Sequence, residues 1–285
     1  MKIRKVTGYI GAEISDLNLA HEITLDISLD LTQALREALS QHQVIFLRSQ
    51  YLNLEQQRKL TKVFGPAMQL PYVEPIAEDP HVIAVLKEAH DHSTGVFGGE
   101  WHTDFSFLPS PPAGSVLNAV EIPDVGGDTV WSSQIAAYES LTPELKQLVD
   151  EREAVHVGKP YGVRFAPLEK ERASQSIKMR RGDPEADRET LHPAVITDPR
   201  SGRRALFVNP IYVTRFADMT EAESAPYLAE LYKHAARPDF SCRLKWQAGD
   251  IAVWDNRMAL HYATNDYDGV RRLLYRTTFS GPAPS

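Results

Sequence analysis

The chain has 285 residues and a formal net charge of −7, and 42% of its residues are hydrophobic. It has no long run of lysine or arginine, which argues against nucleic acid as a partner, and no stretch approaches the roughly 18 apolar residues of a membrane helix. The single cysteine, Cys242, excludes an internal disulfide and a cysteine zinc site, and no apolar signal-peptide segment follows the N-terminus. We therefore expect a cytoplasmic globular protein with no membrane partner.

The first half of the chain mixes helical and strand-like patterns. Helical apolar spacing predicts helices at 31–42, 53–65 and 140–151. The third of these has a well-formed start, with Thr142 as the cap and Pro143 at the first helical position. Apolar runs predict strands at 44–48, 81–88, 114–123 and 128–133.

The second half contains one long helix, several strands and a charged excursion. Residues 219–236 open with a capping box, although Pro226 in the first two turns favours a later helix start. Residues 158–190 lack periodicity and are charged, so we expect a lid insert there. Further strands are predicted at 194–197, 205–209, 242–246, 250–255 and 271–281. Short strands with added helices indicate a mainly β barrel or sandwich.

Two candidate metal ligands lie close together in the segment GGEWHTDFSF. If this stretch is a strand, His102 and Asp104 point to one side, with Trp101, Thr103 and Phe105 on the other. A neutral imidazole and a carboxylate on one face can share a metal ion. They can also form nothing more than a hydrogen-bonded pair.

His261 is the third candidate ligand. It follows a strand-like apolar run in VWDNRMALHYATNDY, after a polar turn at Asp255-Asn256. It is far from Asp104 in the sequence, so a shared site would be built by the fold. Two imidazoles and one carboxylate leave three positions of Fe(II) open for a 2-oxo acid and dioxygen. A zinc hydrolase is an alternative, because zinc accepts the same ligands.

Two arginines near the C-terminus predict an anion site. Arg272 and Arg276 are four residues apart and would share one face of a strand. Both guanidiniums need anionic partners, and guanidinium binds carboxylate in a fixed bidentate geometry. A barrel that holds an organic anion without redox chemistry is therefore a further alternative.

Five motifs in order carry a family resemblance: WHTD, GGDT, HPxVxTxPxSGxxALFVN, WDNRxxxHYAxxDY and RRxxxR. Together they resemble the taurine/2-oxoglutarate dioxygenase (TauD/TfdA-like) family, which includes taurine dioxygenase, alkylsulfatase-type and aryloxyalkanoate-cleaving enzymes. The resemblance runs from about residue 8 to 281. It implies one domain over 1–285, with a mainly β double-stranded β-helix (a cupin-like jelly roll) and flanking helices. It also implies a homo-oligomer.

The resemblance also implies an Fe(II)- and 2-oxoglutarate-dependent dioxygenase that consumes O2 and releases succinate and CO2. The iron ligands that it implies are His102, Asp104 and His261. Thr129 and Arg272 would hold the distal carboxylate of 2-oxoglutarate. Arg276 would face the primary substrate or reinforce the co-substrate site.

The substrate implied by the resemblance is a small organic anion that is hydroxylated and in some members thereby cleaved. Taurine dioxygenases have a histidine and a tyrosine just after the helix that ends at FG, but here Leu70 takes the histidine position and Tyr72 is shifted by one. We therefore expect an aryloxyalkanoate, alkyl sulfate or larger sulfonate, with Tyr72, Tyr161 and Tyr212 in the pocket wall. Taurine dioxygenase proper is the alternative.

Overall fold

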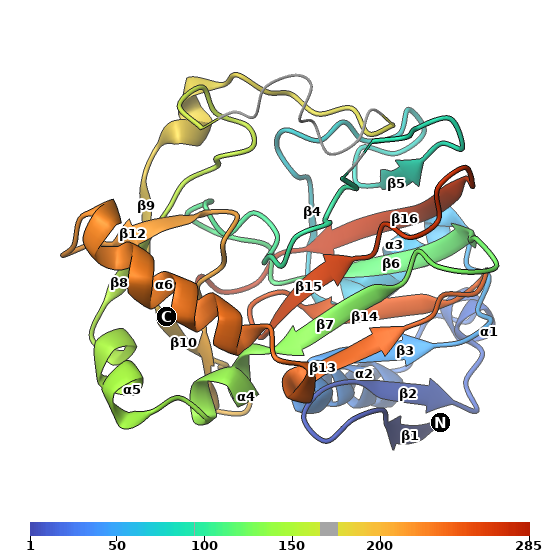
Figure 1. Ribbon diagram of the computed structural model, residues 1–285. Helices are drawn as coiled ribbons and strands as arrows, with labels where there is room; N and C mark the ends of the chain where they lie inside the picture. Colours follow the sequence, from blue (N-terminus) through green and yellow to red (C-terminus); the bar gives the residue numbers. More distant parts are fainter. Residues whose placement is uncertain (94, 166–175) are drawn as a thin grey trace.

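The computed structural model describes residues 1–93, 95–165 and 176–285. Its largest sheet has eight strands (Figure 1), with bounds β1 Lys2–Lys5, β2 Ala12–Ser15, β3 Val44–Leu47, β4 Ala67–Met68, β5 Ile83–Lys87, β6 Gly114–Glu121, β14 Ile251–Asp255 and β16 Arg272–Phe279. The order is β1-β2-β3-β14-β6-β16-β4, and β5 also pairs with β16. Apart from the consecutive strands β1, β2 and β3, neighbouring strands in this sheet come from distant parts of the chain.

Three smaller sheets complete the β structure of the described residues. Their strands are β7 Thr129–Ser133, β8 Glu153–His156, β9 Thr190–Pro193, β10 Val195–Thr197, β11 Arg204–Leu206, β12 Val213–Phe216, β13 Ser241–Leu244 and β15 Ala259–Ala263. The orders are β13-β7-β15, β12-β8-β9 and β10-β11. In Figure 1 the β13-β7-β15 sheet lies across one face of the large sheet. This is the predicted jelly-roll architecture, and the prediction is confirmed.

An aromatic cluster fills the space between the two facing sheets. Trp131 of β7 packs against Phe46 of β3 at 5.3 Å and against Trp254 of β14 at 6.0 Å between ring centroids. Alternate residues of β14, such as Val253, face the opposite way and pack under the helices. Both faces of the central strands are therefore buried, which explains their unbroken apolar runs in the sequence.

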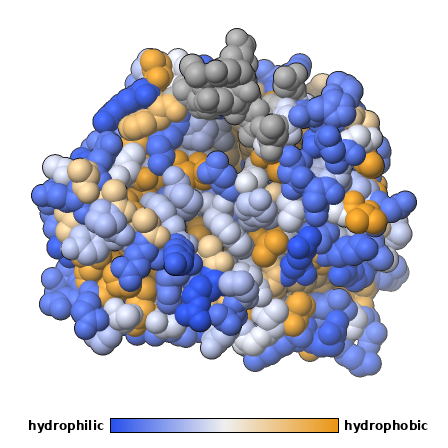
Figure 2. Space-filling model, in the orientation of Figure 1, coloured by the Kyte–Doolittle hydropathy of each residue, from blue (hydrophilic) through white to orange (hydrophobic). Residues whose placement is uncertain are grey.

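Six α-helices flank these sheets in the described part of the chain. They are α1 Leu19–Thr24, α2 Leu29–His42, α3 Leu54–Phe64, α4 Gln134–Glu139, α5 Pro143–Asp150 and α6 Glu221–Ala235. The first three cover the outer face of the large sheet, and α4 to α6 pack beside the smaller sheets (Figure 1). No helix among the described residues is long and apolar enough to cross a membrane. The face in Figure 2 is mostly hydrophilic, with hydrophobic residues in separate small patches.

Helix starts follow the predicted caps. Asn53 and Thr220 each form a capping box with the residue three positions later, and Thr142 caps a helix with proline at its first turn. The later start expected for the 219–236 helix is wrong. Helix α6 begins at Glu221 and contains Pro226, because the capping box at Thr220 fixes the first turn before the proline is reached.

Candidate active site

Three buried side chains of the types that bind metal ions converge in space. They are His102, Asp104 and His261, and one donor atom of each lies within 4.8 Å of the others. His102 Nε2 is 3.6 Å from Asp104 Oδ1, and His261 Nε2 is 3.8 Å from Asp104 Oδ2. Across residues 1–93, 95–165 and 176–285, this is the only such group of three. Two imidazoles and a carboxylate in this arrangement can hold one divalent metal ion.

A single backbone bridge brings the two histidines together. The N–H of His102 donates to the C=O of His261 at 3.1 Å, and the N–H of His261 donates to the C=O of His102 at 2.9 Å. Residues that exchange both bonds lie directly opposite each other, so the two rings sit side by side with centroids 4.0 Å apart. His261 belongs to β15, whereas His102 lies in the loop between β5 and β6.

The segment around His102 is not the strand considered in the sequence analysis. Pairing with β15 stops after the His102 bridge, and Asp104 lies in a turn. The side chain of Asn256 accepts a hydrogen bond from the N–H of Asp104 at 2.8 Å and donates one to its C=O at 2.9 Å. Phe105 then takes a left-handed backbone with φ of 48°. Asp104 therefore reaches the histidines through a turn rather than by strand alternation.

The protonation states of these donors suit a metal ion. His102 Nδ1 is 2.7 Å from the C=O of Glu100 and donates its proton to it, so Nε2 is the ring nitrogen that faces Asp104. Burial, and then the charges of His102 and Arg276, hold the pKa of His261 well below its ordinary value. Burial alone would raise the pKa of Asp104, but the Arg276 guanidinium and both imidazoles outweigh it and lower that pKa. The group therefore offers a neutral imidazole at His261 and an ionised carboxylate at Asp104.

One oxygen of the carboxylate has no hydrogen-bond partner in the described part of the chain. Asp104 Oδ2 is buried, and no donor among the described residues forms a hydrogen bond with it. A buried carboxylate oxygen is costly to leave unpaired, and a bound cation removes that cost. The residues present therefore fit a divalent metal ion.

A small cavity of about 30 Å³ lies beside the two histidines. Its lining includes Thr129 of β7 and both arginines of β16, Arg272 and Arg276. The two arginines share one face of the strand, as predicted from their spacing of four residues and the alternation of side chains along a strand. The structure thus brings the predicted co-substrate residues next to the predicted metal ligands.

Two residues of this small cavity are oriented to receive an anion. Arg272 Nε donates to the C=O of Gly127 at 2.9 Å, and the guanidinium lies over the ring of Tyr267, with Cζ 5.7 Å from the centroid. Within the described chain no carboxylate forms an ion pair with Arg272. The Thr129 hydroxyl accepts a hydrogen bond from Trp246 Nε1 at 2.9 Å, so its own hydrogen can be donated into the cavity.

Arg276 links the small cavity to the metal-binding group. Its Nη1 donates to Asp104 Oδ1 at 3.1 Å, and its guanidinium lies over the ring of Phe97. Its Nε and Nη2 are buried and have no hydrogen-bond partner in the described part of the chain. These two nitrogens belong to a buried, charged guanidinium, and their N–H donors require a further acceptor. Within the described residues, Arg276 therefore has free donors beside the group of His102, Asp104 and His261.

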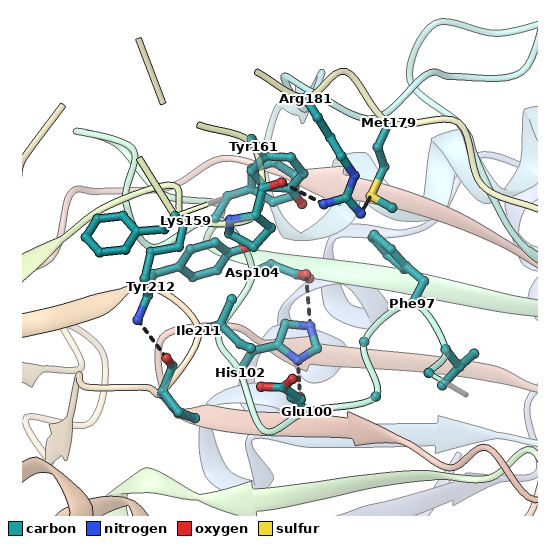
Figure 3. A pocket seen from close by; sticks show the side chains of 18 residues that line it. Phe97, Glu100, His102, Asp104, Lys159, Tyr161, Met179, Arg181, Ile211 and Tyr212 are labelled. Atoms are coloured by element: carbon teal, nitrogen blue, oxygen red, sulfur yellow. Dashed lines mark hydrogen bonds and ion pairs between the residues drawn. The ribbon is translucent and has the colours of Figure 1, made fainter. Parts of the chain in front are cut away.

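A larger cavity of about 350 Å³ is lined by two of the same donors, His102 and Asp104. Figure 3 shows His102 and Asp104 on one side of it, with Arg181 and Met179 across from them. The other side chains labelled on its walls are Phe97, Glu100, Lys159, Tyr161, Ile211 and Tyr212. Aromatic and aliphatic side chains thus form most of a wall that also carries charged groups.

The three tyrosines predicted for the pocket wall have different positions. Tyr161 and Tyr212 line the large cavity, and burial raises the pKa of Tyr161 to about 12, so it stays protonated. Tyr72 is not among the lining residues but stacks on Tyr161 with ring centroids 5.0 Å apart. Leu70 packs in the same aromatic cluster and lines a separate small cavity.

The predicted lid at 158–190 borders the large cavity on both described sides of its gap. Phe165, Met179 and Arg181 are lining residues. Residues 166–175, the middle of the predicted lid, lie outside the described residues. The lid therefore stays a prediction.

Sequence reasoning missed two contributions to this region. Asn256 was read as part of a polar turn, yet its side chain holds the backbone of Asp104. Lys159 was not singled out, yet it lines the large cavity and donates to the C=O groups of Pro210 and Val213 at 2.9 and 3.0 Å. The sequence WDN draws attention to Asn256, but it does not show that the Asn256 side chain bonds to the backbone of Asp104.

Several known proteins that are similar to this chain in sequence or fold are named as dioxygenases. An alkylsulfatase from Acinetobacter baylyi is 35% identical over 283 residues, covering 99% of this chain and 85% of that protein. An alpha-ketoglutarate-dependent sulfate ester dioxygenase from Pseudomonas putida is 34% identical, covering 100% of this chain and 91% of that protein. The crystal structure of a taurine dioxygenase from Burkholderia xenovorans matches with a TM-score of 0.80 and 30% identity, covering 99% of this chain and 92% of that one.

The jelly roll, the buried donor group and these relatives define a 2-oxoglutarate-dependent dioxygenase that uses a metal ion. The profile described as the taurine catabolism dioxygenase TauD, TfdA family matches residues 2–278. The chain belongs to that family. The predictions of family, fold class and enzyme class are confirmed.

Proposed function

We propose that this enzyme uses Fe(II) and 2-oxoglutarate to hydroxylate the carbon that bears the ester oxygen of an alkyl sulfate. The observation that carries the proposal is the meeting of two cavities at three buried metal-binding side chains. The substrate class is supported by the two full-length relatives named as an alkylsulfatase and a sulfate ester dioxygenase.

In this proposal His102, Asp104 and His261 hold the iron. Two neutral imidazoles and one carboxylate leave positions open for an oxo acid and dioxygen. The unpaired Asp104 Oδ2 and the low pKa values of Asp104 and His261 support this assignment. When bound, the iron activates dioxygen, so that decarboxylation of 2-oxoglutarate to succinate is coupled to hydroxylation of a substrate C–H bond.

Thr129 and Arg272 bind the distal carboxylate of 2-oxoglutarate in the small cavity. The Arg272 guanidinium supplies a fixed positive charge. The Thr129 hydroxyl already accepts a hydrogen bond from Trp246, so it is free to donate its own hydrogen to the carboxylate. Because Arg272 is buried and has no carboxylate partner within the described chain, an incoming carboxylate compensates its charge. This arrangement also selects a co-substrate with an acid group at each end.

Arg276 receives the sulfate group of the primary substrate. Its Nε and Nη2 are buried and unpaired within the described residues, and its Nη1 is already bonded to Asp104. A sulfate held there lies beside the metal-binding group, which brings the adjacent carbon close to the reactive centre. Arg276 thus both orients one oxygen of Asp104 and binds the substrate anion.

The large cavity takes the apolar body of the substrate. Phe97, Tyr161 and Ile211 give it aromatic and aliphatic walls, and Tyr212 closes the side next to Ile211. Tyr72 supports this wall indirectly by stacking on Tyr161. Filling the cavity with an apolar chain expels water from the neighbourhood of the metal ligands.

Hydroxylation at the carbon beside the ester oxygen leads to cleavage. The resulting sulfate hemiacetal collapses to an aldehyde and inorganic sulfate, because sulfate is a good leaving group. The reaction therefore releases one succinate and one CO2 for each sulfate ester consumed.

The test is to supply the Fe(II)-loaded enzyme with 2-oxoglutarate, O2 and a panel of anions, and to measure succinate and inorganic sulfate together. The panel contains medium-chain alkyl sulfates, a larger alkyl sulfonate, an aryloxyacetate and taurine. We expect alkyl sulfates to give the fastest turnover, with equal amounts of succinate and sulfate. Faster turnover of taurine, or succinate without sulfate, would contradict the proposed substrate while leaving the enzyme class intact.

A further inference from the structure

The loop that carries Asp104 is held by a side chain where strand pairing ends. His102 is the last residue of this loop that forms a backbone bridge with β15. Asp104, two residues later, has no strand neighbour, and its N–H and C=O are bonded instead to Oδ1 and Nδ2 of Asn256, at 2.8 and 2.9 Å. The amide of Asn256 therefore makes the same pair of bonds that a neighbouring strand would make.

Asn256 is itself rigidly placed. It is fully buried, and its backbone N–H donates to the C=O of Ala113 at 2.9 Å. The second hydrogen of its Nδ2 goes to the C=O of Pro112 at 3.1 Å. Every donor of the side-chain amide is thus used, which fixes the amide in a single orientation.

The backbone next to Asp104 needs such support. Phe105 has φ of 48°, in the left-handed region that aromatic residues rarely adopt. Such conformations persist only where surrounding contacts impose them. The two hydrogen bonds from Asn256 to the preceding residue provide this constraint.

Two independent restraints therefore act on Asp104. Asn256 fixes its backbone, and Arg276 Nη1 binds its Oδ1 at 3.1 Å. With both in place, Oδ2 is the carboxylate oxygen left without a hydrogen-bond partner within the described chain. The carboxylate thus presents one defined oxygen beside the two imidazoles.

We propose that Asn256 is a positioning residue of the metal centre, which sets the Asp104 carboxylate in its ligating position before the metal arrives. This inference rests on the proposed role of Asp104 as a metal ligand. Asn256 touches neither the metal nor the substrate in this account. Asn256 raises the affinity for the metal, because the Asp104 loop is already ordered and binding of the ion does not have to order it.

The direct test measures Mn(II) affinity without 2-oxoglutarate or substrate, from the EPR signal of the unbound ion. Asn256→Ala should weaken Mn(II) binding about 10- to 100-fold, the usual effect of losing a residue that orients a metal ligand. The matched control is Asn118→Ala. Asn118 is also buried and donates to the C=O of Leu52 at 2.9 Å and to Gln57 Oε1 at 3.2 Å, away from the metal-binding group.

The outcomes separate positioning from general destabilisation. We expect both variants to lower the melting temperature, and only Asn256→Ala to weaken Mn(II) binding by more than about threefold. Equal Mn(II) affinity in the two variants would overturn the inference. Mn(II) binding by His261→Ala at the wild-type affinity would instead overturn the metal assignment on which the inference rests.

A second measurement uses the wild-type protein and does not depend on the variants folding. Hydrogen exchange in the metal-free protein should show the Asp104 amide protected as strongly as the bridged amide of His261, because both are already bonded. Fast exchange at Asp104 that becomes slow only after Mn(II) is added would show that the loop is ordered by the metal, and would contradict preorganisation by Asn256.

Discussion

The two cavities that meet at the metal-binding group are built in different ways. The small cavity takes most of its polar residues from strands: Thr129 from β7, His261 from β15, and Arg272 and Arg276 from β16, with His102 added from a loop. The large cavity is lined mainly by loop residues, such as Tyr161 and Tyr212. One region is small and cationic, and the other is more than ten times larger by volume, about 350 against 30 Å³, and rich in aromatic side chains.

This difference matches the two tasks of the enzyme. Strands in a packed sheet have fixed spacing, which suits a co-substrate that is the same in every turnover. Loops on a rigid scaffold change sequence and length without disturbing the core, so they suit the recognition of varied substrates. We therefore expect substitution of Arg272 in the strand-built cavity to affect 2-oxoglutarate, and substitutions in the loop-built cavity to affect the primary substrate.

The largest effect is expected at the junction of the two cavities. Asp104→Ala removes the only carboxylate of the proposed ligand group and should reduce coupled succinate formation below detection, with the fold retained by circular dichroism. Asp79→Asn is the matched control, since Asp79 is also buried and pairs with Arg58 at 3.1 Å, away from both cavities. Retention of full coupled activity by Asp104→Ala would contradict the metal assignment.

Loss of the Arg272 guanidinium should weaken the binding of 2-oxoglutarate and not that of the primary substrate. Arg272→Ala should raise the KM for 2-oxoglutarate by about 10- to 100-fold, the cost of one charge-assisted hydrogen-bonded pair, and change the KM for the alkyl sulfate much less. Arg271→Ala is the control, because that neighbouring side chain is partly exposed and pairs with Glu88 and Glu121 instead. Equal increases in both KM values would mean that the small cavity is not the separate co-substrate site.

A substitution in the wall of the large cavity should affect the alkyl sulfate and leave 2-oxoglutarate binding unchanged. Tyr161→Phe removes one hydroxyl from the large cavity and should lower kcat/KM for the alkyl sulfate by about 2- to 10-fold, the usual value of one hydrogen bond. The KM for 2-oxoglutarate should stay the same. Tyr72→Phe, one ring further from the cavity, serves as the comparison and should have a smaller effect. A larger effect of Tyr72→Phe would show that Tyr72 touches the substrate directly.

The smallest effect concerns the stability of the folded protein in mild acid. His156 of β8 contacts Ser106 Oγ at 2.9 Å, and burial, then the charges of His192 and Lys159, hold its pKa well below 6.5. The unfolded chain takes up a proton near pH 6.5 that the folded protein does not, so stability falls as the pH drops below that value.

His156→Gln should remove this dependence. The slope of unfolding free energy against pH between about pH 6 and 5 should flatten by up to about 1.4 kcal/mol per pH unit, measured by urea unfolding of the metal-free protein. An unchanged slope would mean that His156 is not the group that titrates.

Local signals in the sequence predicted the regular parts of the fold well. The Thr142-Pro143 start and the Asn53 and Thr220 caps lie where the helices begin, because caps act through residues within one turn. The placement of Arg272 and Arg276 on one face followed from the period of two. Several short strands, such as β8 and β12, were not predicted, since each is defined by pairing with a distant segment.

The turn at Asp104 was beyond local prediction for the same reason. The alternation of His102 and Asp104 suggested a strand, but pairing ends after one bridge. What replaces it is a side chain from another part of the chain, Asn256, and a left-handed residue at Phe105 that is not glycine. Neither has a sequence pattern that distinguishes it from an ordinary turn. The resemblance to known enzymes identified the ligands, but the way the fold holds them had to come from the structure.

The central claim is that 2-oxoglutarate binds a metal ion held by His102, Asp104 and His261 and reaches it from the strand-built cavity. Anaerobic titration of the Fe(II)-loaded enzyme with 2-oxoglutarate tests this directly, through the weak visible charge-transfer band that forms when an oxo acid chelates Fe(II). We predict a saturable band in the wild-type enzyme, and saturation at about 10- to 100-fold higher 2-oxoglutarate in Arg272→Ala. A wild-type enzyme that binds Fe(II) but gives no such band, or an Arg272→Ala variant that saturates at the wild-type concentration, would contradict the account.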